Sequence, residues 1–74
     1  MAWFTNVAVS RTFASNDSQN AWVEFGGTWR RIKTGATDGV TNLFIMFNAA
    51  KANGRTVTVF VEDATNLVTI AYLN

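Results

Sequence analysis

Residues 40–62 contain the pattern of a helix followed at once by a strand: VTNLFIMFNAAKANGRTVTVFVE. Thr37 or Asp38 can cap such a helix at its start. Asn53-Gly54 supplies a favourable left-handed stop at the other end. Three valines then alternate with other residues over 55–62, which predicts a strand with one face toward a core. This stretch therefore predicts the one helix of the chain and the strand that follows it.

The predicted helix, residues 40–52, is apolar on nearly every side. One helical stripe is formed by Val40, Leu43, Phe44 and Phe47. Much of the remaining surface is also apolar, through Ile45, Met46, Ala49 and Ala52. A helix with this pattern is normally covered on more than one side, and the sheet of a 74-residue chain can cover only one. We therefore expect an oligomer interface made by Leu43, Ile45, Met46, Ala49 and Ala52.

The rest of the sequence has the period of two that is typical of half-buried strands. Polar turn residues at 14–20 and the Gly26-Gly27 pair separate the first segments. The predicted strands are residues 3–13, 21–25, 29–33, 55–62 and 67–73. With the helix between the third and fourth strands, the order β-β-β-α-β-β is that of an OB-fold, a small five-stranded Greek-key barrel. We expect one mainly β domain over residues 1–74.

Composition excludes several kinds of chemistry. The chain has no Cys and no His, so it has no thiolate nucleophile, no imidazole base and no ligands for a zinc finger. Its five acidic residues fall in no catalytic motif, and we expect neither an enzyme nor a bound metal or cofactor. A net charge of +1 disfavours nucleic acid as a partner. No apolar run approaches the roughly 20 residues of a membrane span.

Three segments have counterparts in a known family. Residues 4–10 are FTNVAVS, and residues 69–73 are TIAYL. Residues 43–62 combine an apolar helix, a glycine and a valine-rich strand that leads into the acidic turn Glu62-Asp63. Together they resemble the B subunits of bacterial toxins that are built from one A chain and five B chains, especially the subtilase cytotoxin branch. The resemblance covers most of the chain.

The resemblance implies a ring of five protomers that binds cell-surface glycans. In such a ring the helices face the central channel and the sheet edges pair between neighbours. An A-type catalytic chain is then a further partner, and secretion is favoured. Residues 1–13, however, lack the charged start and long apolar centre of a signal peptide, and the disulfide common in the family has no counterpart here.

Three residues are candidates for sugar binding. In the subtilase cytotoxin branch a serine just before the core of the first strand binds a sialic-acid carboxylate, and the matching residue here is Thr5. Trp29 offers an aromatic face for a sugar ring, as Trp22 also does, and Arg31 offers a cation for an anionic sugar. The alternatives are a packing role for the tryptophans and a solvated or ion-paired role for the arginine.

Two other functions are compatible with the sequence. The apolar helix and unpaired strand edges could serve a structural, self-assembling protein that has no small ligand. Alternatively, the cluster of Trp29, Arg30, Arg31 and Lys33 could bind single-stranded nucleic acid on a barrel face.

Overall fold

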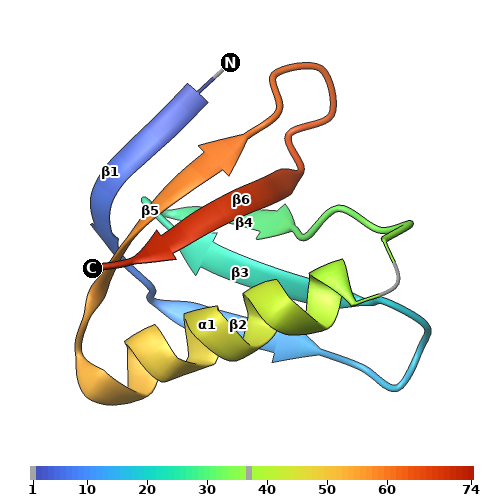
Figure 1. The fold of residues 1–74 in the computed structure, drawn as a ribbon, viewed down its shortest axis with the longest axis horizontal. Helices are drawn as coiled ribbons and strands as arrows, with labels where there is room; N and C mark the ends of the chain where they lie inside the picture. Colours follow the sequence, from blue (N-terminus) through green and yellow to red (C-terminus); the bar gives the residue numbers. More distant parts are fainter. Residues whose placement is uncertain (1, 37) are drawn as a thin grey trace.

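The computed structural model describes residues 2–36 and 38–74. These residues form one helix and six strands (Figure 1). In order they are β1 (Ala2–Ala8), β2 (Arg11–Ala14), β3 (Ala21–Phe25), β4 (Thr28–Arg31), α1 (Gly39–Asn53), β5 (Thr56–Val61) and β6 (Val68–Leu73). The prediction of a mainly β chain with one helix is confirmed.

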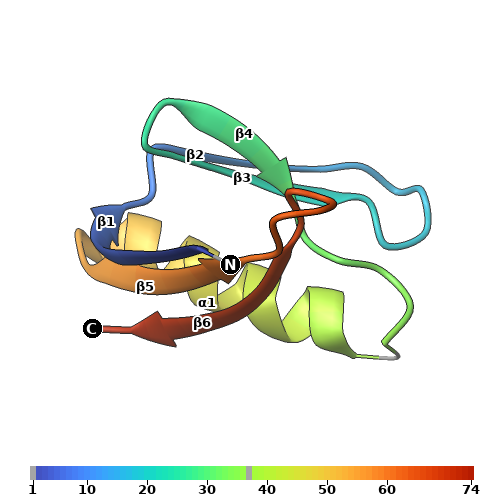
Figure 2. The same cartoon turned by 90° about the horizontal axis from the view of Figure 1, so that it is seen from above.

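The strands form two antiparallel sheets, ordered β1-β5-β6 and β2-β3-β4. Figure 2 shows them as two separate layers. One parallel bridge, between Ile32 and Val68, joins the end of β4 to the start of β6. Within the described ranges, the strand ladders therefore make two sheets rather than a closed barrel.

The prediction of five strands is wrong because residues 3–13 are two strands in different sheets. β1 pairs with β5, whereas β2 pairs with β3. Val9 is buried at the change of sheet, and the Ser10 N–H donates to the Glu24 carbonyl at 2.9 Å. The apolar residues Trp3, Val7, Val9 and Phe13 all occupy odd positions, so the sequence gives no signal of the break. In the fold Trp3 and Phe13 are exposed, because the facing of the chain changes at the irregularity after Phe4 and again at the change of sheet.

The helix lies where its sequence pattern predicts it. Gly54 has φ 64°, the left-handed stop that the sequence predicts. Asp38 stands at the N-cap position but makes no side-chain capping hydrogen bond; instead its carbonyl accepts from the Asn42 N–H at 2.9 Å. Thr37, the other candidate cap, lies outside the described residues.

The core lies between the two sheets and α1. The helix contributes Val40, Phe47 and Ala50, and it contacts strands of both sheets. The sheets contribute alternating residues such as Val23 and Phe25 of β3 and the three valines of β5. All buried side chains of the described residues are apolar. Burial of apolar surface is therefore the main force that joins the layers.

Arg30 joins the sheets in a different way. Its guanidinium carbon lies 4.6 Å from the ring centre of Phe4 and 4.5 Å from that of Phe25. Its Nη1 donates to the Phe25 carbonyl at 3.2 Å, and its Nε donates to Asn66 Oδ1 at 3.4 Å. Burial lowers the pKa of Arg30, which nonetheless remains a cation. Since Phe4 belongs to β1 and Phe25 to β3, this cation–π contact spans the two sheets.

Replacing Arg30 with Met should destabilise the fold. The variant keeps an apolar stem but loses both cation–π contacts and two hydrogen bonds, so we expect the free energy of unfolding to fall by about 1–2 kcal/mol. Urea denaturation at a fixed protein concentration measures the change. Arg55→Met, at an exposed position, is the matched control and should stay within about 0.5 kcal/mol of the parent. Equal stability of the two variants would contradict a role for Arg30 in joining the sheets.

Candidate functional site

The outer face of the β1-β5-β6 sheet carries a group of aromatic rings. Trp3 lies against Phe60 edge-on, with ring centres 5.0 Å apart, and stacks on Tyr72 at 5.9 Å with an interplanar angle of 18°. Trp3 is 42% exposed and Tyr72 is 58% exposed. We name these three residues the aromatic platform. Its rings come from three different strands; those of Trp3 and Tyr72 are nearly parallel and exposed, whereas the half-buried Phe60 ring is inclined to Trp3 by 62°.

Polar side chains form a network beside the platform. Asn74 Nδ2 donates to Asn6 Oδ1 at 2.8 Å and to Thr58 Oγ1 at 3.1 Å, and the Asn6 N–H donates to the same hydroxyl at 3.4 Å. Thr58 and Tyr72 are paired residues of β5 and β6, which places the network next to the platform. Amide and hydroxyl groups therefore stand at one edge of the aromatic rings.

Thr5 lies at the same edge, inside an irregularity of β1. The register of β1 with β5 shifts between Phe4 and Val7, so Thr5 and Asn6 are the unpaired residues of a bulge. Both are exposed, and Asn6 has φ 54°, a left-handed conformation that asparagine tolerates better than most residues. Thr5 is therefore exposed to solvent at the bulge, beside the aromatic platform.

Trp29 and Arg31 lie on the other sheet and do not join Thr5. They belong to β4, where Trp29 is paired with Glu24 and Arg31 with Trp22. A hollow of about 570 Å³ on this outer face is lined by Phe13, Asn20, Trp22 and Trp29; we name it the tryptophan pocket. The three sugar-binding candidates are therefore divided between two faces, with Trp29 in the pocket and Arg31 beside it.

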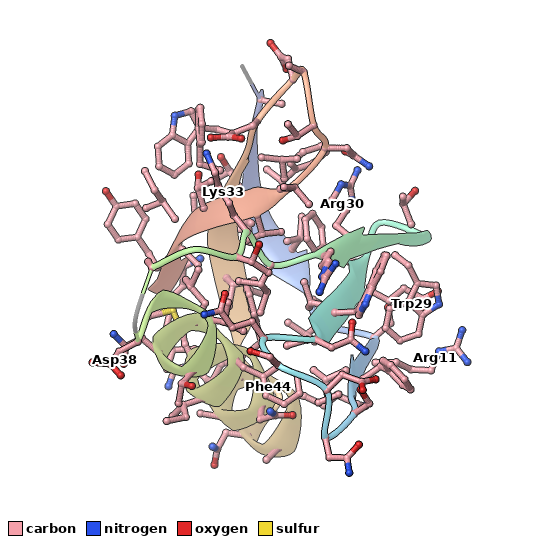
Figure 3. The ribbon with its side chains drawn as sticks, turned by 90° about the vertical axis from the view of Figure 1, so that its right-hand side faces the viewer. Arg11, Trp29, Arg30, Lys33, Asp38 and Phe44 are labelled. Atoms are coloured by element: carbon pink, nitrogen blue, oxygen red, sulfur yellow. The ribbon has the colours of Figure 1, made fainter. Side chains whose placement is uncertain are left out.

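An ion pair borders the tryptophan pocket. Arg11 Nε lies 3.0 Å from Glu24 Oε1, and the Arg11 guanidinium covers the Trp29 ring at 5.2 Å (Figure 3). The hydrogen bond from Arg11, reinforced by its charge, lowers the pKa of Glu24. The pair fixes one side of the pocket and leaves little net charge there.

The basic cluster of the sequence is dispersed in the fold. Arg30 lies over the rings of Phe4 and Phe25, and Lys33 Nζ forms an ion pair with Glu62 at 2.9 Å. Figure 3 shows Lys33 far from Trp29. Hydrogen bonds from Lys33 and Thr65 lower the pKa of Glu62. The four residues that could have bound single-stranded nucleic acid therefore do not share one surface.

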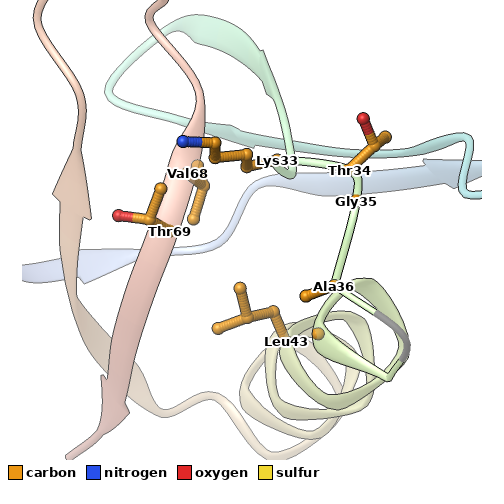
Figure 4. A pocket seen from close by; sticks show the side chains of 8 residues that line it. Lys33, Thr34, Gly35, Ala36, Leu43, Val68 and Thr69 are labelled. Atoms are coloured by element: carbon orange, nitrogen blue, oxygen red, sulfur yellow. The ribbon is translucent and has the colours of Figure 1, made fainter.

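Four of the five residues predicted for an oligomer interface lie on one face of the helix, and the fifth does not. Ile45 is 63% exposed, Ala52 is exposed, and Met46 and Ala49 are half-buried. Leu43 differs, because it packs against the core and lines a second hollow of about 430 Å³ with residues such as Lys33 and Thr69 (Figure 4). The outward helix face thus comprises Ile45, Met46, Ala49 and Ala52, and Leu43 lies apart from it.

The described residues offer no metal-binding cluster. No group of three or more His, Cys, Asp or Glu side chains that could hold an ion lies within residues 2–36 and 38–74. In the same part of the chain, no helix has the length and apolar character that a membrane crossing requires.

Sequence reasoning missed the aromatic platform. Trp3 and Tyr72 are nearly a whole chain apart in sequence, and only the pairing of β1 and β6 with the central strand β5 brings them together. One signal was available: Trp3 and Thr5 share a parity in the first strand, opposite to the core-facing Phe4. The alternation within one strand does not say which strands pair, and the pairing order β1-β5-β6 is what brings Tyr72 to Trp3.

Removing the Arg11 side chain should raise the pKa of Glu24. A depressed carboxyl pKa adds stability that is complete above the unfolded-state pKa and is lost as the pH falls through the folded-state value. In Arg11→Met we therefore expect the Glu24 titration to move up toward an ordinary glutamate, the stability above the unfolded-state pKa to decrease, and the loss of stability on acidification to become smaller. NMR titration of the Glu24 carboxyl carbon measures its pKa in the parent and in the variant. Lys33→Met is the control: it should raise the pKa of Glu62 and leave Glu24 unchanged. An unchanged Glu24 in Arg11→Met would show that another group holds its pKa down.

Comparison with known proteins gives no family for the chain: no protein-family model matches it, and no curated protein matches its sequence.

Proposed function

We propose that this chain is a glycan-binding module of the OB-fold type that acts as an oligomer, most simply a ring of five, and that the aromatic platform is its principal sugar site. The observation that supports this proposal is the stacked pair of exposed rings, Trp3 and Tyr72, with hydroxyl and amide groups at one edge. Aromatic faces bind the apolar C–H face of a sugar ring, while neighbouring polar groups form hydrogen bonds with its hydroxyls.

The hydroxyl and amide groups at this edge can form hydrogen bonds with a neutral or an acidic sugar. Asn74 hydrogen-bonds both Asn6 and Thr58 and so holds these polar groups in place. The exposed Thr5 lies next to Asn6 in the bulge. A non-glycine residue in a left-handed conformation is a form of local strain that often accompanies binding sites. Asn6 fits this pattern, because its conformation makes the bulge that exposes Thr5.

The OB-fold part of the proposal is supported by the chain path. The first strand segment enters both sheets, the helix lies between β4 and β5, and a parallel bridge joins β4 to β6. These are the features expected of a small Greek-key barrel whose ladders are partly open. The two sheets would then be the two halves of one barrel.

The oligomer part is supported by apolar surface on the helix. The outward helix face has Ile45 largely exposed at its centre, together with Met46, Ala49 and Ala52. Exposed apolar patches on small proteins commonly mark interfaces. Several copies of a weak sugar site in one assembly would raise avidity by factors of about 10² to 10⁴. An A-type chain would add a catalytic partner to the same assembly.

A glycan array probed with the assembled protein tests the sugar site. We expect binding to at least one sugar class, and Trp3→Ala should weaken it at least about tenfold because the stacking plane is lost. Lys51→Ala changes an exposed residue of α1, outside both outer sheet faces, and should leave that binding unchanged. A blank array for every sugar class would contradict the glycan site and favour the self-assembling protein without a ligand.

The same glycan distinguishes the role of Thr5. Thr5→Val keeps the shape but removes the hydroxyl, so binding should weaken about fivefold, whereas Thr5→Ser should bind as the parent does. If the valine variant binds as tightly as the serine variant, the Thr5 hydroxyl makes no contact with the sugar.

Native mass spectrometry over a range of concentrations tests the assembly. We expect a closed five-subunit species, and Ile45→Asp should convert it to smaller forms because the interface would bury an unpaired charge. Ile70→Asp is the matched control, since Ile70 is also exposed but lies on a sheet face. A parent protein that remains monomeric at every concentration would contradict the oligomer.

A further inference from the structure

The tryptophan pocket is a concave aromatic surface on the sheet that the aromatic platform does not use. We propose that it is a second ligand site, which takes one six-membered sugar ring that bears a carboxylate, of the uronate kind, with Arg31 as the anchor for that carboxylate. The pocket is separate from the platform, because its residues come from β2, β3 and β4 and the loop before β3. This proposal therefore does not require the platform to bind sugar.

The cross-strand register sets the walls of the pocket. Phe13 and Trp22 are directly paired, and so are Trp22 and Arg31. Trp29 lies diagonally from Trp22, next to Glu24. The hollow of about 570 Å³ is more than the volume of one sugar ring needs, and it opens on the solvent side of the sheet.

The tryptophan ring at the centre of the pocket is held in place before any ligand arrives. Trp22 Nε1 donates to Asn20 Oδ1 at 3.0 Å, and Asn20 Nδ2 donates to Ser15 Oγ at 2.8 Å. The second tryptophan, Trp29, is covered by the Arg11 guanidinium. Rings that are already fixed lose little conformational entropy when a ligand stacks on them. The same bonds occupy the polar groups of Asn20, so the lining itself is almost purely aromatic.

Arg31 supplies a charge that the rest of the protein leaves unused. Arg11 is paired with Glu24, and Arg30 lies over two phenylalanine rings. Arg31 Nη2 makes one long hydrogen bond, to the Gln19 carbonyl at 3.4 Å, and its Nε is shielded from solvent with no hydrogen-bond partner. No ion pair joins it to a carboxylate of the described residues. A shielded donor without a partner is costly, so a turn of the Arg31 guanidinium toward an anion in the pocket would relieve that cost.

The position of the charge selects the ligand. Directly paired strand residues have their Cβ atoms about 4.5–5.5 Å apart, so the Arg31 side chain begins beside the Trp22 ring. A ring stacked on Trp22 therefore presents its edge to Arg31. In a uronate the carboxylate is attached to that edge, and Arg31 binds it once its guanidinium turns toward the pocket and its Nη2 leaves the Gln19 carbonyl. A neutral hexose fills the same space but leaves the Arg31 donors without an anion.

Titration of the untagged protein with galacturonate and with galactose, followed by NMR, tests the proposal. We expect galacturonate to shift the indole signals of Trp22 and Trp29 and the Nε signal of Arg31, and to bind at least about tenfold more tightly than galactose. Arg31→Gln should abolish that preference, and Arg31→Lys should keep part of it because the charge remains without the planar fork. Equal binding of the two sugars by the parent, or an unchanged preference in Arg31→Gln, would overturn the proposal.

Two controls distinguish a uronate site in the tryptophan pocket from binding at the platform and from a nucleic-acid site. Trp3→Ala removes the platform and should leave galacturonate binding intact, so loss of platform binding alone would not affect the proposal. Signals that shift only at Trp3 would overturn it. An oligothymidylate that competes for the pocket more strongly than galacturonate at physiological salt would also overturn it, in favour of a single-stranded nucleic-acid site.

Discussion

The need for two small sheets and one helix to share a single apolar core determines most of this structure. Each sheet has only three strands, and three strands with one covered face are near the lower limit for stability. The buried side chains of both sheets and of α1 form one cluster, in which Phe25 and Phe47 are the largest members. No layer could be stable alone, because each would expose its apolar face. The change of sheet at Val9 and Ser10 allows one continuous segment to take part in both layers.

This shared core also explains where the binding surfaces lie. Each strand alternates between the core and the outside, so every residue that faces the core leaves a neighbour on an outer face. On β1 that neighbour is Trp3, and on β3 it is Trp22. The aromatic platform and the tryptophan pocket are therefore on the outer faces of different sheets. Each is carried by a hydrogen-bonded ladder that holds its rings in place, which suits recognition by stacking.

The sequence was sufficient for elements that depend on neighbouring residues. The helix and its glycine stop, the hairpin after Gly26-Gly27 and the valine-rich strand are all local patterns. The features that the sequence analysis predicted wrongly or missed depend on contacts between residues that are distant in the sequence. The split of the first strand leaves no mark on the apolar sequence pattern, although the inward-facing side changes there, and the partner of each outward ring is set by strand order. The apolar character of Leu43 predicts an interface, yet its half-buried place against the core follows from how the helix is rotated on the sheets.

The placement of Arg30 gives the molecule a joint that does not titrate in acid. Surface pairs such as Arg11 with Glu24 weaken once their carboxylates take up protons, since the charge on one partner disappears. Arg30 instead contacts two phenylalanine rings, a carbonyl and a side-chain amide, none of which gains a proton in mildly acidic water. Falling pH would therefore weaken the Arg11–Glu24 and Lys33–Glu62 pairs first, while the Arg30 contact between the two layers is kept.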